Sequence, residues 1–341
     1  MQYIKRENSL QIPLLAELEE LYMFTSDKTI TAAKIGLLER VFDSSLKPIQ
    51  DLFNKYAGTE YNFKFADKRY EPLDLAEHDD KNIIVCFSGG KDSVAVVQHY
   101  IKQGYNVYLY HLKHITPAQS DEYLVAQQFA DYWHLPLFID TVKLSGYNDY
   151  VEHPMKNMVI ANGALLYGIE NGIGTKIAFG NYTTSSLEDD NFEYCGGDCY
   201  ELWDCYNQII QRIIPNFEVL ITLENLGQTL DLICSNKDIL DMTVSCIGRA
   251  NLRQHKRAWV KKKYDIIIPK HRCGQCYKCC VEYIYMADHG LQDYNVDYYK
   301  YCLGKLKQNY EAEEGRQVTD DEVWNRYFIY PKEQSKLVEE N

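Results

Sequence analysis

The chain has 341 residues, of which 46% are hydrophobic and 25% charged, and its formal net charge at neutral pH is −13. These fractions are typical of a globular protein with room for about two domains, and they exclude wholesale disorder. No apolar run approaches the ~18 residues of a membrane-spanning helix, and the first residues lack the apolar core of a signal peptide. We therefore expect a cytoplasmic protein without a membrane partner.

The first eighty residues are predicted to be mainly helical. Apolar side chains recur at helical spacing between residues 10 and 57, with interruptions near Ser44 and Pro48. A polar, charge-rich stretch from residue 64 to 81 is typical of a connection. We expect residues 1–80 to form a helical N-terminal extension, to which the sequence assigns no role.

From residue 81 onward, strands and helices are predicted to alternate. Short apolar runs predict five strands, at residues 83–87, 105–112, 137–139, 176–180 and 217–221. Helical spacing predicts helices from Asp92 to Gly104, from Pro117 through Trp133, and over residues 158–169. Such alternation is typical of parallel β-α-β units, so the expected fold class is α/β, a doubly wound parallel sheet over residues 81–242.

The loop after the first predicted strand carries the clearest chemical signal, the run Ser88-Gly89-Gly90-Lys91-Asp92-Ser93. In an open parallel sheet, ligands bind beyond the carboxyl ends of the strands, where this loop lies. Adjacent glycines let a ligand approach the backbone, and the N-terminus of the following helix favours negative charge. Two hydroxyl groups and one ammonium group add donors. The pattern predicts an anion site, and pyrophosphate is the anion that it favours.

Two other phosphate-binding patterns are excluded at this loop. A Walker A loop would need Gly where Val85 stands and Ser or Thr where Asp92 stands, and a GxGxxG fingerprint is absent. The structural alternative is a tight glycine turn that begins a helix, with Asp92 and Ser93 as helix caps. Six matching residues between a buried strand and a helix favour the anion site.

The cysteines form one clear metal-binding pattern. In a reducing compartment the eleven cysteines are expected to be free, catalytic or metal-bound rather than paired as disulfides. Cys273, Cys276 and Cys279 are spaced C-x-x-C-x-x-C, and Cys246 lies upstream as a fourth thiolate. Four thiolates suit structural Zn²⁺, and an iron–sulfur cluster is the competing interpretation. Cys280 is either a spare thiol or an alternative ligand.

The glycine loop resembles the SGGxDS signature of the PP-loop (N-type) ATP pyrophosphatases, whose fold is adenine nucleotide alpha hydrolase-like. The resemblance implies that Ser88 to Ser93 hold the departing pyrophosphate of ATP while a substrate oxygen is adenylylated, with Mg²⁺ neutralising the phosphates. It implies catalytic roles for Lys91, Asp92 and Ser93, with Asp92 nearest the metal. It also implies nucleoside contacts by the chain near Phe87, Tyr110, His111 and Gly180.

Within this superfamily the chain resembles the 7-cyano-7-deazaguanine synthase (QueC) family, which places one Cys, a variable stretch and Cys-Gly-x-Cys-x-x-Cys after its PP-loop domain. Cys246 and the segment 273–279 fit that order, with a longer insert between them. The run from His153 resembles the family's Pro-x-Arg-Asn. The resemblance covers residues 81–285, and it implies that three residues contact the substrate: Lys156 (in place of Arg), Asn157 and Asp198.

The resemblance implies that ATP activates the carboxylate of a small 7-deazaguanine-type substrate, followed by amide and nitrile formation with ammonia. Lys156 in place of Arg loses a bidentate contact to that carboxylate, and Arg249 is a second cation suited to orient it. Related proteins in antiviral defence join a deazaguanine to a protein, so the acceptor stays open between ammonia and a protein amine. A homodimer is compatible with the sequence.

Residues 243–341 are expected to form a zinc-binding, helical C-terminal region. Between Cys246 and Cys273 the chain holds nine Lys and Arg residues against a single Asp. This basic stretch, residues 249–272, allows a nucleic-acid partner and the alternative of a tRNA-modifying PP-loop enzyme, although the acidity of the whole chain disfavours both. A non-catalytic nucleotide-binding protein is the third alternative. A further cysteine cluster is interpreted as a solvated loop leading into a helix, with a second metal site or a part of the substrate pocket as alternatives: Cys195, Cys199 and Cys205.

Overall fold

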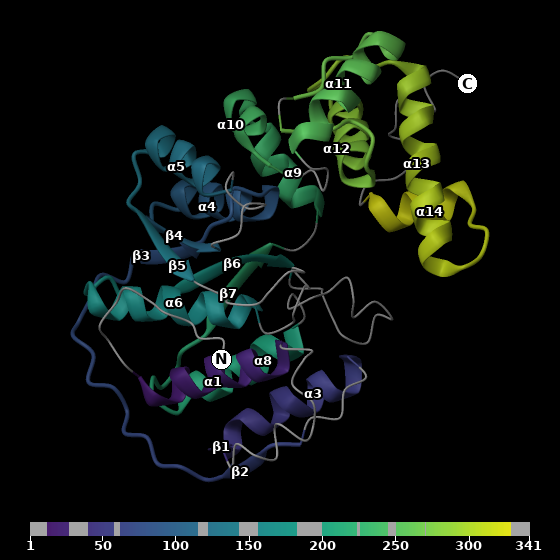
Figure 1. Ribbon diagram of the computed structural model, residues 1–341. Coiled ribbons are helices and arrows are strands. Elements are labelled where there is room, and N and C mark those ends of the chain that lie inside the picture. Colours follow the sequence, from purple (N-terminus) through teal and green to yellow (C-terminus); the bar gives the residue numbers. More distant parts are fainter. Residues whose placement is uncertain are drawn as a thin grey trace. The chain divides into compact units, whose positions relative to one another are not determined.

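The computed structural model describes residues 12–26, 40–57, 62–114, 122–142, 156–182, 200–223, 226–244, 250–269 and 271–328. The chain forms two compact units (Figure 1). The first contains residues 1–88 and 100–222, and the second contains residues 89–99 and 223–341. Neither unit is a continuous stretch of sequence.

The first unit is built on a five-stranded sheet with the strand order β5-β4-β3-β6-β7. The strands are β3 (Asn82–Cys86), β4 (Asn106–His114), β5 (Leu137–Val142), β6 (Ile177–Tyr182) and β7 (Val219–Leu223). The pairings of β3 with β4, of β3 with β6 and of β4 with β5 are parallel. All five strands overlap the predicted ones, which confirms an α/β fold with a parallel sheet.

Helices cover both faces of this sheet (Figure 1). One face carries α5 (Glu122–Trp133), which packs against β4 and β5, and the other carries α6 (Lys156–Glu170), which packs against β3, β4 and β6. Because helices cover both faces, successive side chains of β3 are buried whichever face they point to, and Ile83, Ile84 and Val85 are fully buried. This explains the unbroken apolar run in its sequence. The doubly wound arrangement predicted from the sequence is therefore present.

The strand order reverses at β3. The chain leaves β3 through α4 (Lys91–Lys102) and returns as β4 on one side of it, whereas β6 pairs with its other side. In open α/β sheets, ligands bind beyond the carboxyl end of the strand at such a reversal. Residues 87–90, which follow β3 directly, therefore occupy the position where this fold binds ligands.

The N-terminal helices share a core with the sheet. Helix α1 (Pro13–Ser26) packs against α6, where the buried Asn162 side chain donates to the Leu15 carbonyl at 3.3 Å. The same amide accepts a hydrogen bond of 3.1 Å from the hydroxyl of Tyr206, on α8 (Tyr200–Gln211). The expected domain limits after residues 80 and 242 remain a prediction, because shared packing does not show which segments fold alone.

One segment predicted as helix is extended. Residues Val41–Asp43 form β1, which pairs in parallel with β2 (Lys64–Ala66), and the 3₁₀ turn η1 (Ser44–Leu46) leads into α3 (Lys47–Ala57). Asp43 explains the difference, because its buried carboxylate accepts from the backbone N–H groups of Ser45 at 2.9 Å and Lys68 at 3.0 Å and from the Arg212 guanidinium. These bonds hold the chain extended where apolar spacing alone predicts a helix.

The second unit is helical. Besides most of α4 it contains α9 (Leu226–Cys234), α10 (Lys237–Met242), α11 (Ala250–Tyr264), α12 (Tyr277–Asp288), α13 (Val296–Glu314) and α14 (Asp320–Tyr327). Helix α12 packs against α9 and α13, and α13 packs against α14. None of the helices in the described ranges combines the length and the apolar composition that crossing a membrane requires.

Candidate functional site

The turn between β3 and α4 is shaped by glycine. Gly89 is buried and has a φ of +76°, a conformation that residues with a side chain rarely adopt. The first backbone hydrogen bond of α4 runs from Val94 N–H to the Gly90 carbonyl at 3.0 Å. The N–H groups of residues 91–93 lie ahead of this bond, in the turn where helices attract anions.

The side chains of this first helical turn are in contact with one another. The Lys91 ammonium and the Asp92 carboxylate form an ion pair, with side-chain exposures of 13% and 34%. The buried Ser93 hydroxyl donates to the Gly90 carbonyl at 3.0 Å, which makes Ser93 a structural part of the turn. The arrangement places one cation and one carboxylate beside a helix N-terminus, a combination suited to a phosphate group with its divalent cation.

A distant segment of the second unit holds this turn. The Val244 N–H donates to the Gly89 carbonyl at 3.0 Å. Val244 follows α10 and stands two residues before Cys246, a predicted metal ligand that lies outside the described residues. Sequence reasoning missed this contact, since a hydrogen bond between two backbone groups leaves no side-chain pattern.

In the first unit, three residues predicted to contact a nucleoside lie together. The Phe87 N–H donates to the Tyr110 carbonyl at 2.8 Å, and Nδ1 of His111 lies 2.8 Å from the Phe87 carbonyl oxygen. The Phe87 ring packs edge-on against Phe129, with centroids 5.5 Å apart, and the Tyr110 hydroxyl donates to Asp140 at 2.7 Å. Both side chains belong to the core, so only the backbone of Phe87 and Tyr110 is available to a ligand.

His111 is a buried imidazole within β4. A carbonyl oxygen can only accept a hydrogen bond, so Nδ1 carries the proton that is shared with Phe87. Burial lowers the pKa of His111, against the opposing effect of that hydrogen bond. The ring is therefore neutral at neutral pH, and its Nε2 is an acceptor.

Of the other residues predicted to contact the nucleoside or the substrate, the structure describes only some. Gly180 lies inside β6, two residues before the strand ends at Tyr182, and not at the strand end as predicted. Asn157 lies half-buried in the first turn of α6. The side chain of Lys156 and the whole of Asp198 lie outside the described residues, so the predicted substrate contacts stay a prediction.

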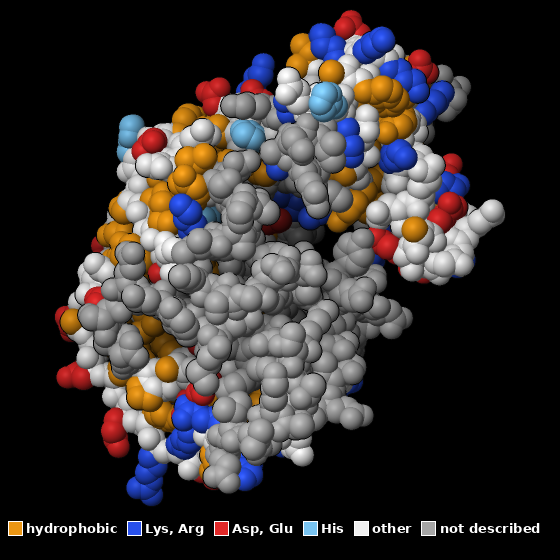
Figure 2. Space-filling model, viewed as in Figure 1, with side chains coloured by type: hydrophobic (Ala, Val, Ile, Leu, Met, Phe, Trp, Pro, Cys, Tyr) orange, Lys and Arg blue, Asp and Glu red, His pale blue; other side chains and the backbone are white. Residues whose placement is uncertain are grey.

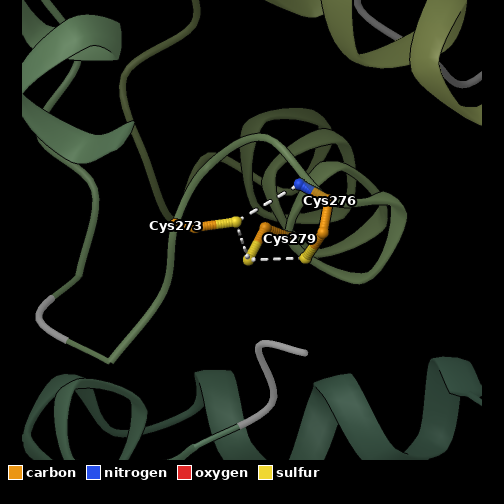
Figure 3. Close-up of side chains that lie close together, drawn as sticks. All are labelled: Cys273, Cys276 and Cys279. Carbon is orange, nitrogen blue, oxygen red and sulfur yellow. Dashed lines mark hydrogen bonds between the residues drawn. The ribbon is translucent and has the colours of Figure 1, made fainter. Parts of the chain in front are cut away.

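Three thiols of the second unit converge (Figure 3). The Sγ atoms of Cys273 and Cys276 lie 3.9 and 3.4 Å from the Sγ of Cys279. The backbone N–H groups of Gln275 and Cys276 each lie 3.3 Å from the Cys273 sulfur. Tetrahedral ligands at about 2.3 Å from Zn²⁺ are about 3.8 Å apart, so this spacing fits one metal ion. Among the described residues, this is the group that could hold a metal.

The turn between the first two thiols requires glycine. Gly274 has a φ of +70°, and a Cβ there would meet Ile268 Cγ1 and Tyr298 Oη at 2.9 Å. The Tyr298 hydroxyl also donates to the Gly274 carbonyl at 2.6 Å. The predicted Cys-Gly-x-Cys knuckle is therefore fixed by its backbone conformation and by a buried tyrosine.

Cys280 is engaged by another thiol. A hydrogen bond with Cys302 of α13, followed by burial, raises the pKa of Cys280. Among the described residues, the group of thiols that lie close enough to share a metal does not include Cys280, which favours the spare thiol.

A buried ion pair adjoins the three thiols. Arg272 Nε donates to the Glu282 carboxylate on α12, with side-chain exposures of 2% and 1%. Arg272 Nη1 also donates to the carbonyls of Leu240 at 2.7 Å and Thr243 at 3.3 Å. Burial works against the charge, but the Glu282 carboxylate raises the pKa of Arg272. Sequence reasoning missed this pair. The signal that could have revealed it is Glu282, a charged residue within the otherwise apolar run of α12.

A doubly wound parallel sheet with a glycine turn after its first strand is the architecture of nucleotide-binding α/β proteins. More particularly, the chain is 28% identical over 138 residues to 7-cyano-7-deazaguanine synthase 2 of Sulfurisphaera tokodaii. The match spans 40% of this chain and 29% of that protein. It confirms the predicted resemblance to this branch of the PP-loop proteins. No protein-family model matches the chain.

Two solved structures are distantly similar. The U34-tRNA thiolase NcsA of Methanococcus maripaludis, solved with its [4Fe-4S] cluster, is 18% identical with a TM-score of 0.32, over 54% of this chain and 68% of that one. The NMN synthetase of Francisella tularensis is 11% identical with a TM-score of 0.29, over 81% of this chain and 98% of that one.

Proposed function

We propose that the chain is an ATP pyrophosphatase of the PP-loop type, which adenylylates a 7-deazaguanine-type carboxylate and then transfers the acyl group to nitrogen. The observation that carries the proposal is the Gly89 turn, which follows β3 where the strand order reverses. Similarity to a 7-cyano-7-deazaguanine synthase supports the choice of substrate. The same similarity supports ammonia as the acceptor, and a protein amine is the alternative.

The proposed reaction has two steps. A carboxylate oxygen attacks the α-phosphorus of ATP, the bond to the bridging oxygen breaks, and pyrophosphate leaves. A nitrogen nucleophile then attacks the acyl carbon, AMP leaves, and the nitrogen gives up a proton to solvent. With ammonia the product is an amide. The amide oxygen then attacks the α-phosphorus of a second ATP, pyrophosphate leaves, and loss of AMP and of the two nitrogen-bound protons gives the nitrile.

The residues of the first turn of α4 have distinct roles in this proposal. Lys91 and the N–H groups of residues 91–93 bind the departing pyrophosphate, whose charge they offset. Asp92 holds Mg²⁺, which supplies charge neutralisation between the phosphates when it is bound. Ser93 keeps the turn in shape through its bond to Gly90. In the proposal, the backbone of Phe87 and Tyr110 and the ring of His111 contact the nucleoside.

The thiol cluster has a structural role in this proposal. Cys273, Cys276 and Cys279, with Cys246 as the fourth thiolate, would hold Zn²⁺, whose chemistry there is to cross-link the chain and to stabilise its fold. An iron–sulfur cluster is the alternative occupant. Metal analysis of the purified protein together with its visible absorption separates the two, since Zn²⁺ is colourless.

The test is a mass-spectrometric assay with ATP, Mg²⁺ and 7-carboxy-7-deazaguanine, with and without ammonia. We expect AMP and pyrophosphate together with an adenylate, amide or nitrile, or a mass added to the protein if a protein amine is the acceptor. Asp92→Asn should abolish AMP release, whereas Asp131→Asn, an exposed carboxylate on α5, should leave it unchanged. Formation of ADP and orthophosphate would refute the proposal. Turnover that requires RNA would identify a tRNA-modifying enzyme. Binding of ATP without any turnover would identify a non-catalytic nucleotide-binding protein.

A further inference from the structure

Helix α11 carries a concentration of positive charge that the proposed function does not use. It contains no acidic residue, and its cations are Arg253, Lys256, Arg257, Lys261, Lys262 and Lys263. Val260 faces inward and is fully buried. We call the exposed side of the helix the α11 basic face; it comprises His255, Trp259, Lys261, Lys262 and Lys263. Figure 2 shows Lys and Arg side chains gathered over the part of the second unit where Figure 1 labels α11.

The cations of this face have little internal compensation. Lys261 has an acidic neighbour, Asp265, at 3.7 Å, but that side chain is 94% exposed, so the pair is weak. Within the described ranges, Lys262 and Lys263 make no ion pair with an acidic residue. The helix C-terminus attracts the three lysines of its last turn. Further upstream, the Arg257 guanidinium donates to the Arg272 carbonyl at 3.5 Å, so Arg257 is not counted as part of the face.

An aromatic ring lies among these charges. Trp259 is 39% exposed, and the Lys263 ammonium lies 5.0 Å from its ring centroid. On the neighbouring helix α13, the Tyr301 ring lies 5.6 Å from Trp259, and the Lys305 ammonium lies 5.8 Å from Tyr301. Two neighbouring rings, Trp259 and Tyr301, therefore lie between two lysines, Lys263 and Lys305.

We propose that the α11 basic face binds single-stranded nucleic acid, with its lysines against phosphates and Trp259 stacked on a base. Aromatic rings set among cations are the arrangement by which proteins hold single strands without reading their sequence. From His255 to Lys263 the helix rises about 12 Å, the length of about three stacked nucleotides. A membrane surface fits less well, because a helix that lies in a bilayer needs an exposed apolar face, and Val260 is buried. An acidic protein would use the charges but not the ring.

The test measures the fluorescence anisotropy of a fluorescein-labelled single-stranded 20-mer, as RNA and as DNA, against protein concentration at several salt concentrations and without ATP. We expect salt-dependent binding. The triple variant K261Q/K262Q/K263Q should lower the slope of log affinity against log salt by about 2, since each lost phosphate contact removes about 0.7. Trp259→Ala should weaken binding about tenfold while leaving the salt slope unchanged.

A matched control uses three exposed lysines outside α11. The variant K64Q/K102Q/K237Q makes the same change in net charge and should keep the wild-type affinity within about twofold. Unchanged thermal melting and metal content exclude unfolding of each variant. No binding at low salt, or equal weakening by both triple variants, would overturn the proposal. Binding of polyglutamate with the same affinity as nucleic acid, unaffected by Trp259→Ala, would also overturn the proposal. It would assign the face to an acidic protein. Because ATP is absent, none of these results depends on the proposed enzyme activity.

Discussion

The two compact units are stabilised in different ways. The first buries long apolar runs in one continuous cluster that extends from Ile12 to Val219, so its stability is spread over many side chains. The second gathers three thiols and the buried pair of Arg272 and Glu282. Thiolates repel one another without a metal, and a buried charge without its partner is strongly unfavourable. The loss of a single group should therefore affect the second unit more than the first.

The largest effect is expected from the thiol cluster. Cys276→Ser should remove the bound metal and destabilise the second unit by several kcal/mol, because metal binding to such a site contributes folding free energy. Metal content by mass spectrometry and thermal melting followed by tryptophan fluorescence measure both effects. Trp133 and Trp203 report on the first unit, and Trp259 and Trp324 on the second.

Cys280→Ser is the matched control for that variant. Cys280 is buried and is adjacent in sequence to the ligand Cys279, but its bond to Cys302 can be kept by a serine hydroxyl. The metal should stay bound at the wild-type stoichiometry. Loss of metal from this variant, or its retention after Cys276→Ser, would contradict the set of ligands.

Arg272→Met should have the next largest effect. It leaves the Glu282 carboxylate buried without its partner and removes the donors to the carbonyls of Leu240 and Thr243. Removing one partner of a buried pair destabilises by about 3–5 kcal/mol, whereas the double variant Arg272→Met/Glu282→Leu should recover much of the loss. Urea unfolding of the single and double variants measures this, and equal destabilisation of both would contradict the assignment.

A glycine in each unit tests local packing, with a smaller effect. A Cβ at Gly168, on α6, would meet the Gly174 carbonyl oxygen at 2.3 Å and Ile84 Cδ1 at 2.5 Å, so Gly168→Ala should destabilise the first unit by about 1–3 kcal/mol. Gly304, on α13, has nothing within 4 Å of a Cβ, so Gly304→Ala should be neutral or stabilise by up to about 1 kcal/mol. Thermal melting compares the two, and a shift of the same sign in both would contradict the packing argument.

The smallest effect concerns α14. The Arg316 side chain, followed by the bonds from Thr319, lowers the pKa of Glu322 from its ordinary 4.5 to about 2. A lowered carboxyl pKa means that the stabilisation is present above pH about 4.5 and is lost as the pH falls toward about 2. The difference in melting temperature between wild type and Glu322→Gln should therefore shrink over that interval. A difference that stays constant with pH would contradict the role of this carboxylate.

The sheet could be predicted because its signals are local. Apolar runs such as Ile83 to Val85 mark strands buried on both faces, and the glycine loop follows one of them directly. The segment 41–43 was predicted wrongly, since Asp43 is held extended by partners more than twenty residues away. The bonds of Arg272 to the carbonyls of Leu240 and Thr243, and of Val244 to Gly89, also join distant segments through backbone groups, and single-sequence patterns carry no record of them.

The division of the chain into compact units has a practical consequence for anyone who dissects this protein into fragments. The boundaries at residues 88/89, 99/100 and 222/223 mean that the backbone passes from one unit to the other three times. A fragment that begins at residue 223 lacks the segment 89–99 that completes its unit, and it deprives the Gly89 carbonyl of its donor at Val244. Cutting the gene after residue 222 would therefore leave the C-terminal half without residues 89–99, and would leave the N-terminal half with that segment but without the unit that it completes, so co-expression of overlapping fragments is the sounder design.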